Sequence, residues 1–269
     1  MKDYLRQLAG QSDSHLASGL LVREYLQARI LQSLQDRGMF LRWAFLGGTA
    51  LRFLYSVPRF SEDLDFSLMT SGGDSGFRPA LEEVKRAFAV EGYPIEVLVS
   101  ERKTVASAWV KFPGLPRELG LSPHAAQTLS IKVEVDTCPP AGAGIETTVV
   151  RRHVTLHLCH YDQASLLAGK LHAILSRPWA KGRDLYDLAW YLADRNWPAP
   201  NLELLNAALT QTGWKGPVMT AANWRTELLN RIEGLDWEKA RADVRPFLER
   251  MGDLSLVTLD VLRNLLRGK

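Results

Sequence analysis

Two aspartates one residue apart, Asp63 and Asp65, lie inside the apolar segment RFSEDLDFSL. In a β-strand, residues two apart point to the same face, so both carboxylates would project together while Leu64 and Phe66 face the core. Two carboxylates about 4 Å apart repel by on the order of 4 kcal/mol at an effective dielectric constant of 20. A cation must offset this repulsion, and divalent ions such as Mg²⁺ or Mn²⁺ prefer oxygen ligands. The pair therefore predicts a metal site.

A glycine pair precedes these aspartates. Gly47 and Gly48 follow a short apolar run, and Thr49 opens an expected helix. Glycine lets backbone amides approach an anion, and a helix N-terminus adds partial positive charge. Alone, a Gly-Gly pair is usually a turn, and an Asp-x-Asp pair at a strand end is usually solvated. Thirteen residues separate Gly-Thr from Asp-Leu-Asp, and phosphates beside metal-binding carboxylates are the arrangement of phosphoryl and nucleotidyl transfer.

The segment SIKVEVDT offers a third carboxylate. Lys132, Glu134 and Asp136 alternate with apolar residues and would share one face of a strand. A transfer site needs another acid to hold a second metal or to activate the attacking hydroxyl. An exposed amphipathic strand is an equally good interpretation. We predict Glu134 as the third acid, because Asp136 lies nearer the strand end, although the spacing leaves Asp136 open.

Two later segments, SLLAGKLHAILSR and KGRDLYDLAWYL, place charged residues in helical patterns. Lys170 lies in an apolar helix, where an unpaired cation is costly unless its stem extends to water. We expect the stem to reach water. Asp184 lies in the first turn of the next helix, where a carboxylate suits the helix dipole. Arg183 and Asp187 are four residues apart and are expected to form a surface pair.

The elements that position these residues change character along the chain. Apolar spacing predicts a helix over residues 14–37, and valine-rich runs broken by Gly and Pro predict a β-rich region up to residue 160. The expected strands cover residues 43–46, 64–68, 95–100, 107–112, 129–136 and 149–158, with helices at 49–55 and 79–90. From residue 161 the pattern is helical. We therefore expect two domains, residues 1–160 and 161–269.

Taken in order, these motifs resemble those of a known family. Gly-Gly-Thr, RFSEDLDF, KVEV, the helical Lys170 and KGRDLYDL occur in the order seen in AbiEii/AbiGii-type nucleotidyltransferase toxins, including the MenT toxins. These belong to the polymerase-β-like nucleotidyltransferase superfamily. The resemblance covers residues 45–192. It implies an α+β fold in which a polymerase-β-like core, a mixed sheet flanked by helices, is followed by a C-terminal helical bundle.

The resemblance also implies roles for individual residues. It assigns nucleotide binding to Gly47, Gly48, Thr49, Arg59, Ser61 and Lys170. It assigns catalysis to Asp63, Asp65, Lys170 and Asp184. Asp63 and Asp65 would bind the metal, joined by Glu134 from the strand argument above. Because phosphoryl-type transfer relies on positioning and charge, we expect Lys170 and Asp184 to line the same cleft as the two aspartates.

The implied activity is Mg²⁺- or Mn²⁺-dependent transfer of NMP from an NTP to RNA. Some relatives act on the 3′ end of tRNA, and such toxins have a cognate antitoxin partner. The same chemistry could modify a small molecule or a protein hydroxyl, or transfer a phosphoryl group as a kinase does. A non-catalytic nucleotide-binding module is the alternative from another class, and the full set of acidic residues argues against it.

Composition limits the partners and the compartment. The formal net charge of +3 over 269 residues neither requires nor excludes nucleic acid. No run of eighteen apolar residues occurs, so we expect no membrane span. The two cysteines favour a reducing compartment, and we expect the cytoplasm. In HVTLHLCH, His153, His157 and Cys159 would be spread along too great a length of strand for one zinc ion.

Overall fold

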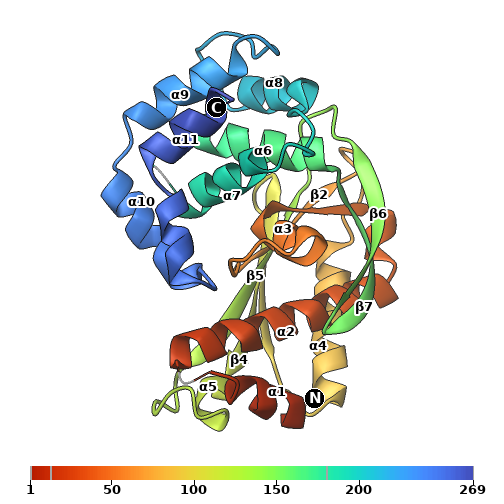
Figure 1. Ribbon diagram of the computed structural model, residues 1–269. Helices are drawn as coiled ribbons and strands as arrows, with labels where there is room; N and C mark the ends of the chain where they lie inside the picture. Colours follow the sequence, from red (N-terminus) through yellow and green to blue (C-terminus); the bar gives the residue numbers. More distant parts are fainter. Residues whose placement is uncertain (1, 13, 180, 269) are drawn as a thin grey trace. The chain divides into compact units, whose positions relative to one another are not determined.

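The computed structural model describes residues 2–12, 14–179 and 181–268 (Figure 1). The chain divides into two compact units. The sheet unit consists of Met1–Tyr55, Phe60–Pro139 and Thr147–His160. The helical unit consists of Ser56–Arg59, Pro140–Glu146 and Tyr161–Lys269. Two short segments from before residue 160 thus belong to the helical unit. A single boundary at residue 160 does not describe this division of the chain.

Seven strands of the described chain form one mixed sheet, in the order β3-β4-β5-β2-β1-β7-β6. The strands are β1 (Trp43–Leu46), β2 (Leu64–Leu68), β3 (Glu96–Ser100), β4 (Val105–Pro113), β5 (Thr128–Asp136), β6 (Ile145–Arg152) and β7 (Val154–Tyr161). β2 pairs with β5, and β1 with β7, in parallel, whereas β1–β2, β3–β4 and β4–β5 are antiparallel. With helices beside the sheet and in the helical unit, the fold is α+β, as the sequence predicts.

Helices cover one face of this sheet. The sheet unit contains α1 (Lys2–Ala9), α2 (His15–Asp36), α3 (Gly47–Tyr55), α4 (Phe77–Val90) and α5 (Leu115–Glu118). The Ser14 side chain caps α2 by accepting a hydrogen bond from the Ala17 amide, which satisfies a donor at the helix start. α2 packs on α4 and β5. Along β5, Ile131, Val133 and Val135 are buried, and the residues between them are only partly buried. The predicted alternation in β5 is confirmed.

The strand expected over residues 149–158 is wrong. Two strands, β6 and β7, are found there, separated by His153, whose φ of 61° lies in the left-handed region. The buried Glu24 holds this break by accepting hydrogen bonds from Arg152 at 2.8 Å and from His153 at 3.0 Å, and it also pairs with Arg52 at 2.6 Å. Burial would raise the pKa of Glu24, but His153 and the two arginines lower it to about 2. The local pattern contains no Gly or Pro to reveal this break.

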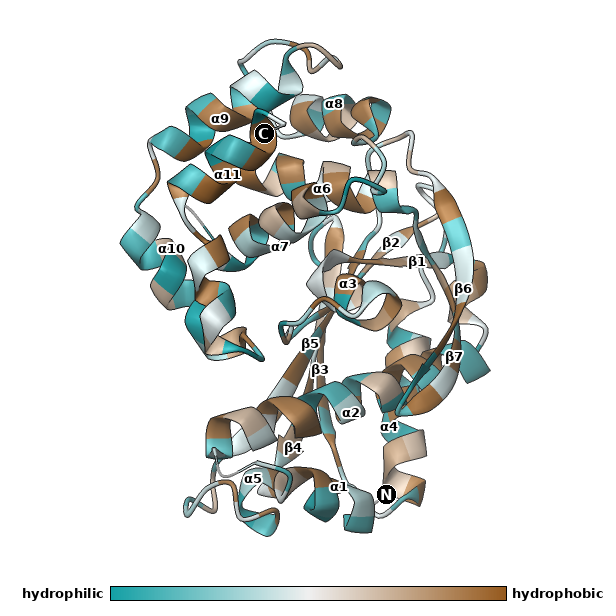
Figure 2. Ribbon diagram, in the orientation of Figure 1, coloured by the Kyte–Doolittle hydropathy of each residue, from teal (hydrophilic) through white to brown (hydrophobic). Residues whose placement is uncertain are grey.

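The helical unit is built around α6. Its helices are α6 (Gln163–Ser176), α7 (Gly182–Ala193), α8 (Leu202–Gln211), α9 (Trp224–Glu233), α10 (Trp237–Val244) and α11 (Leu259–Leu266). Figure 2 shows α6 largely in brown and α10 largely in teal, and α6 contacts α7, α8 and α9. A side chain at Gly182 would overlap the Ala240 carbonyl, so glycine permits the close approach of α7 and α10. No helix in the described ranges is long and apolar enough to cross a membrane.

Candidate active site

The glycine turn lies directly against Asp65. Gly47 begins α3 with a φ of +82°, and a Cβ at this position would overlap the Asp65 Oδ2 atom. Leu46 at the end of β1 is the register partner of Asp65. The start of a helix carries unpaired amides and partial positive charge. Glycine is therefore required here for both its backbone conformation and its lack of a side chain, because the carboxylate occupies that space.

Gly47→Ala should destabilise the chain more than Gly72→Ala. Both glycines have a similar φ, +82° and +78°, but nothing lies within 4 Å of a Cβ at Gly72. Each substitution costs about 1–2 kcal/mol for the left-handed conformation. Gly47→Ala should lose a further ~1–3 kcal/mol for overpacking against Asp65. Urea unfolding measures the difference, and equal losses would show that Asp65 moves away freely.

Thr49 serves the strand that carries the aspartates. Its side chain is buried, and its hydroxyl donates a hydrogen bond to the Asp63 carbonyl. The Thr49 hydroxyl thus donates its hydrogen bond within the sheet unit. The phosphate contact that we expect at Thr49 would therefore be made by its backbone amide. Ser61 is also held through its backbone, because its carbonyl accepts a hydrogen bond from the buried Gln27 at 3.1 Å. Both contacts hold the backbone of the segment that leads into β2.

The two aspartates flank buried apolar residues. Leu64 and Phe66 of β2 are buried, whereas Asp63, just before the strand, and Asp65 within it are half-buried. The burial follows the alternation expected from the sequence. The strand therefore supplies two carboxylates at the edge of the core without placing either one inside it.

Glu134 is the neighbour of Asp65 on the next strand. β2 and β5 run in parallel with Asp65 opposite Glu134 and Ser67 opposite Asp136, and adjacent strands are about 4.8 Å apart. Asp136 accepts a hydrogen bond from the Cys138 amide at 3.0 Å where the strand ends. The register thus favours Glu134 over Asp136 as the acid beside Asp65.

Cationic groups offset the charges of these carboxylates. Lys132 Nζ lies 2.7 Å from Glu134 Oε1. Arg23 of α2 donates a hydrogen bond to the Ser130 carbonyl at 2.5 Å and lies near Glu62 and Asp63. Burial lowers the pKa of Arg23, and the two carboxylates only partly oppose this effect. Sequence reasoning missed Arg23, which stands in the α2 helical pattern without any distinguishing signal.

The predicted metal ligands Asp63, Asp65 and Glu134 are all carboxylates, the type of ligand that suits a hard metal ion. In the described part of the chain, no three His, Cys, Asp or Glu side chains lie close enough together to hold a metal. Asp65 and Glu134 are nevertheless register neighbours, and Asp63 lies two residues before Asp65. Carboxylate oxygens are the ligands that Mg²⁺ prefers. Glu134 Oε1 is paired with Lys132 Nζ in this structure.

In the helical unit, the predicted site residues Arg59, Lys170 and Asp184 form an ion-pair cluster with Asp187 and Arg177, and all of these side chains except that of Arg177 are largely buried. Lys170 Nζ lies 3.0 Å from Asp184 Oδ1 and 2.7 Å from Asp187 Oδ2. Arg59 makes a two-point contact with Asp187, at 2.6 Å from Nε and 2.5 Å from Nη2. Arg177 donates to Asp184. In these contacts three basic side chains meet two carboxylates within the helical unit.

Lys170, Asp184 and Arg59 stay charged at neutral pH. Burial alone would lower the pKa of Lys170, but Asp187 and Asp184 raise it above the usual value. Burial would raise the pKa of Asp184, but Lys170 and Arg177 lower it. Burial likewise opposes the charge of Arg59, and Asp187 outweighs it, so the pKa of Arg59 is raised. The cluster is therefore a fixed, charged element of the helical unit.

Two expectations for this region are corrected. Arg183 and Asp187 do not form a surface pair: Asp187 is fully buried on Arg59 and Lys170, and the Arg183 guanidinium lies 4.3 Å from the Phe247 ring centroid. The stem of Lys170 does not extend to water, since its side chain is 11% exposed and paired. Arg59 is buried and pairs with Asp187, and its predicted role in phosphate binding stays a prediction. Sequence reasoning missed Asp187 and Arg177, although Asp187 stands one helical turn after Asp184.

The family model of the nucleotidyl transferase AbiEii toxin of type IV toxin–antitoxin systems matches residues 29–257. The chain belongs to the AbiEii family. It is a nucleotidyltransferase, and membership of this toxin family implies an NTP substrate and a cognate antitoxin. The match includes the glycine turn, the aspartates and the buried ion-pair cluster.

Solved structures share the AbiEii fold at low sequence identity. The MenT4 nucleotidyltransferase toxin from Mycobacterium tuberculosis is similar with a TM-score of 0.54 and 20% identity, covering 98% of this chain and 99% of that chain. JHP933 from Helicobacter pylori is similar with a TM-score of 0.51 and 19% identity, covering 92% and 90%. Among curated proteins, no match was found. The structural matches therefore support the fold of this AbiEii chain.

Asp187→Ala tests the importance of the ion-pair cluster for stability. The change leaves Arg59 and Lys170 buried without their shared carboxylate, and breaking a buried pair in this way costs about 3–5 kcal/mol. Asp260→Ala is the control, because Asp260 is 86% exposed in its pair with Arg263, and such pairs contribute about 0–1 kcal/mol. Chemical denaturation of both AbiEii variants gives the comparison. A loss at Asp187 no larger than that of the control would contradict the structural role.

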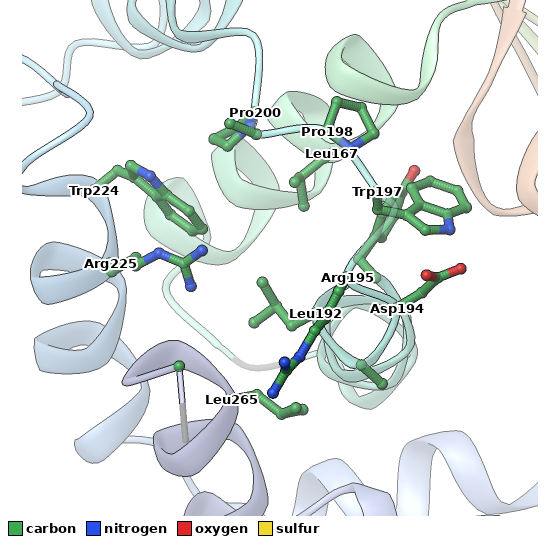
Figure 3. Close-up of a pocket in the computed structure, with 14 residues that line it drawn as sticks. Leu167, Leu192, Asp194, Arg195, Trp197, Pro198, Pro200, Trp224, Arg225 and Leu265 are labelled. Carbon is green, nitrogen blue, oxygen red and sulfur yellow. The ribbon is translucent and has the colours of Figure 1, made fainter.

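A cavity of about 430 Å³ lies elsewhere in the helical unit (Figure 3). Leu167, Trp224 and Arg225 are among its lining residues, and Figure 3 shows Trp224 and Arg225 directed inward from α9. None of the site residues predicted from the sequence lines this cavity. This cavity is therefore separate from the predicted site residues of the AbiEii chain.

Proposed function

We propose that this AbiEii-family chain transfers NMP from an NTP to an RNA acceptor in a Mg²⁺-dependent reaction, and that the 3′ end of tRNA is the acceptor. The observation that carries the chemistry is the contact of Asp65 with the Gly47 turn, with Glu134 as the register neighbour of Asp65. The turn proposed to bind phosphate and the carboxylates proposed to bind the metal are thus adjacent. The RNA acceptor rests on the resemblance to the toxin family.

The sheet unit would bind the phosphates and activate the acceptor. Backbone amides at Gly47, Gly48 and Thr49 bind the triphosphate at the start of α3. Asp63, Asp65 and Glu134 would hold Mg²⁺, which lowers the charge repulsion between phosphate and hydroxyl when bound. The acceptor oxygen attacks the α-phosphorus, forming a new P–O bond as the bond to the β-phosphate oxygen breaks and pyrophosphate leaves. The hydroxyl proton passes to a carboxylate, for which Glu134 is our assignment.

Lys170 of the helical unit is a further phosphate ligand in this proposal. The cluster holds Lys170 charged, and Asp184 and Asp187 fix its position. Asp184 is thus a positioning residue for the lysine, and Arg59 acts one step further away by fixing Asp187. The cognate antitoxin would control this activity in the cytoplasm.

Purified protein incubated with total RNA, Mg²⁺ and each α-labelled NTP in turn tests this function. We expect label to enter RNA with at least one NTP, and chelation of the metal by EDTA to abolish the transfer. Label that moves only to a small molecule or to protein would contradict the RNA acceptor and keep the enzyme class. Transfer that continues unchanged in EDTA would contradict the metal assignment.

A further inference from the structure

An exposed aromatic surface lies on the same sheet face as Glu134. Trp109 of β4 is 43% exposed and Leu98 of β3 is 53% exposed, and the two are cross-strand partners. Trp109 is also the partner of Lys132 on β5, whose Nζ lies 5.9 Å from the indole centroid. We define these three residues as the Trp109 platform. Two large apolar side chains thus lie beside a lysine on the solvent-exposed face of the sheet. The opposite face of these strands packs in the core, and such an exposed apolar surface is unusual.

The register places this platform close to the proposed acids. Lys132 and Glu134 are two residues apart on β5 and therefore share a face, and their side chains form an ion pair at 2.7 Å. With strands about 4.8 Å apart and residues about 3.3 Å apart along a strand, the Cα of Trp109 lies about 8 Å from that of Glu134 and about 12 Å from that of Asp65. One nucleotide unit spans a comparable distance.

The strand order indicates whether the platform lies at the triphosphate end or at the acceptor end of the proposed site. Reading across the sheet, β4 with Trp109 is followed by β5 with Glu134, β2 with Asp65 and β1, which leads into the glycine turn. The triphosphate is assigned to the glycine turn, at one end of this series. The hydroxyl that Glu134 activates must therefore approach from the other end, where the platform lies.

We propose that the Trp109 platform binds the terminal nucleoside of the RNA acceptor. Its base stacks on the indole and against Leu98, and Lys132 contacts the phosphate that precedes it. Base–aromatic stacking tolerates any base, because every base has a π-face. This inference rests on the proposed RNA transfer and adds to it the surface that positions the attacking hydroxyl.

The test is steady-state transfer with RNA whose last nucleotide is intact or abasic. Trp109→Ala should raise the KM for intact RNA by about 5- to 100-fold, the range expected for loss of one stacked base, and leave the KM for NTP unchanged. Trp109→Phe should restore most of the affinity. Trp179→Ala is the matched control, since Trp179 is 61% exposed in the helical unit. Urea unfolding confirms that each variant is folded.

The abasic acceptor separates stacking from other effects. Removing the base should weaken the wild type and add nothing in Trp109→Ala, because the contact is already lost. A raised KM for NTP instead would assign the platform to the incoming nucleotide and overturn the proposal. Unchanged kinetics in Trp109→Ala would also overturn it, with RNA transfer left standing. Binding of single-stranded RNA that depends on Trp109, without any transfer, would contradict the proposed reaction and retain the platform.

Discussion

Asp63→Ala and Asp65→Ala should each reduce nucleotide transfer by on the order of 10³-fold or more, because each removes a proposed metal ligand at the site of charge development. Both side chains are half-buried at the edge of the core, so the free energy of unfolding should change by only about 1 kcal/mol. Transfer of labelled NMP and urea unfolding measure the two effects. Near-normal activity in either variant would show that the metal assignment is wrong.

Glu134→Ala and Asp136→Ala provide a matched pair on one strand face. Glu134 is the register neighbour of Asp65, whereas Asp136 is opposite Ser67 and accepts a hydrogen bond from the Cys138 amide. We expect Glu134→Ala to lose activity as the two aspartate variants do and Asp136→Ala to keep most of it. The opposite order would identify Asp136 as the third acid.

Induced expression of the wild-type chain should arrest bacterial growth, and Lys170→Ala or Asp184→Ala should relieve the arrest. Lys170→Ala removes the proposed phosphate ligand, and Asp184→Ala removes a carboxylate that holds Lys170 at 3.0 Å. Growth curves after induction give the readout. Immunoblots must show equal protein levels, because both changes disturb a buried cluster and could act through unfolding.

Lys215→Ala is a suitable control for this experiment, because Lys215 is an exposed lysine of the helical unit outside the cluster. It should remain as toxic as the wild type. Arrest by Lys170→Ala at wild-type protein levels would contradict the catalytic role of Lys170. A wild-type chain that is harmless in several hosts would contradict the proposed acceptor in those hosts.

Local patterns predicted much of the sheet unit. β1 and β2 match the expected ranges of residues 43–46 and 64–68, because short apolar runs there are bounded by Gly, Pro and charged residues. The two faces of β5 also match, since period-two alternation determines which residues enter the core. These features depend on neighbours within a few residues, and such neighbours are visible in the sequence.

Contacts between distant segments could not be predicted in the same way. Arg59 and Asp187 are 128 residues apart, and their pairing assigns Arg59 to the helical unit. The break at His153 depends on Glu24, 129 residues away. In each case a buried carboxylate hydrogen-bonds to a partner from a remote segment, and neither local spacing nor propensity carries that information. The same limit explains why Lys170 was expected to extend to water.

The mass of the acceptor RNA after reaction is the most direct test of nucleotidyl transfer. Purified tRNA is incubated with the wild-type chain, Mg²⁺ and unlabelled NTP, with Asp65→Ala in parallel, and intact RNA is analysed by mass spectrometry. The account predicts a gain of whole NMP residues at the 3′ end, seen with the wild type and absent with Asp65→Ala. A gain of a phosphoryl group alone, or a gain that persists in Asp65→Ala, would contradict it.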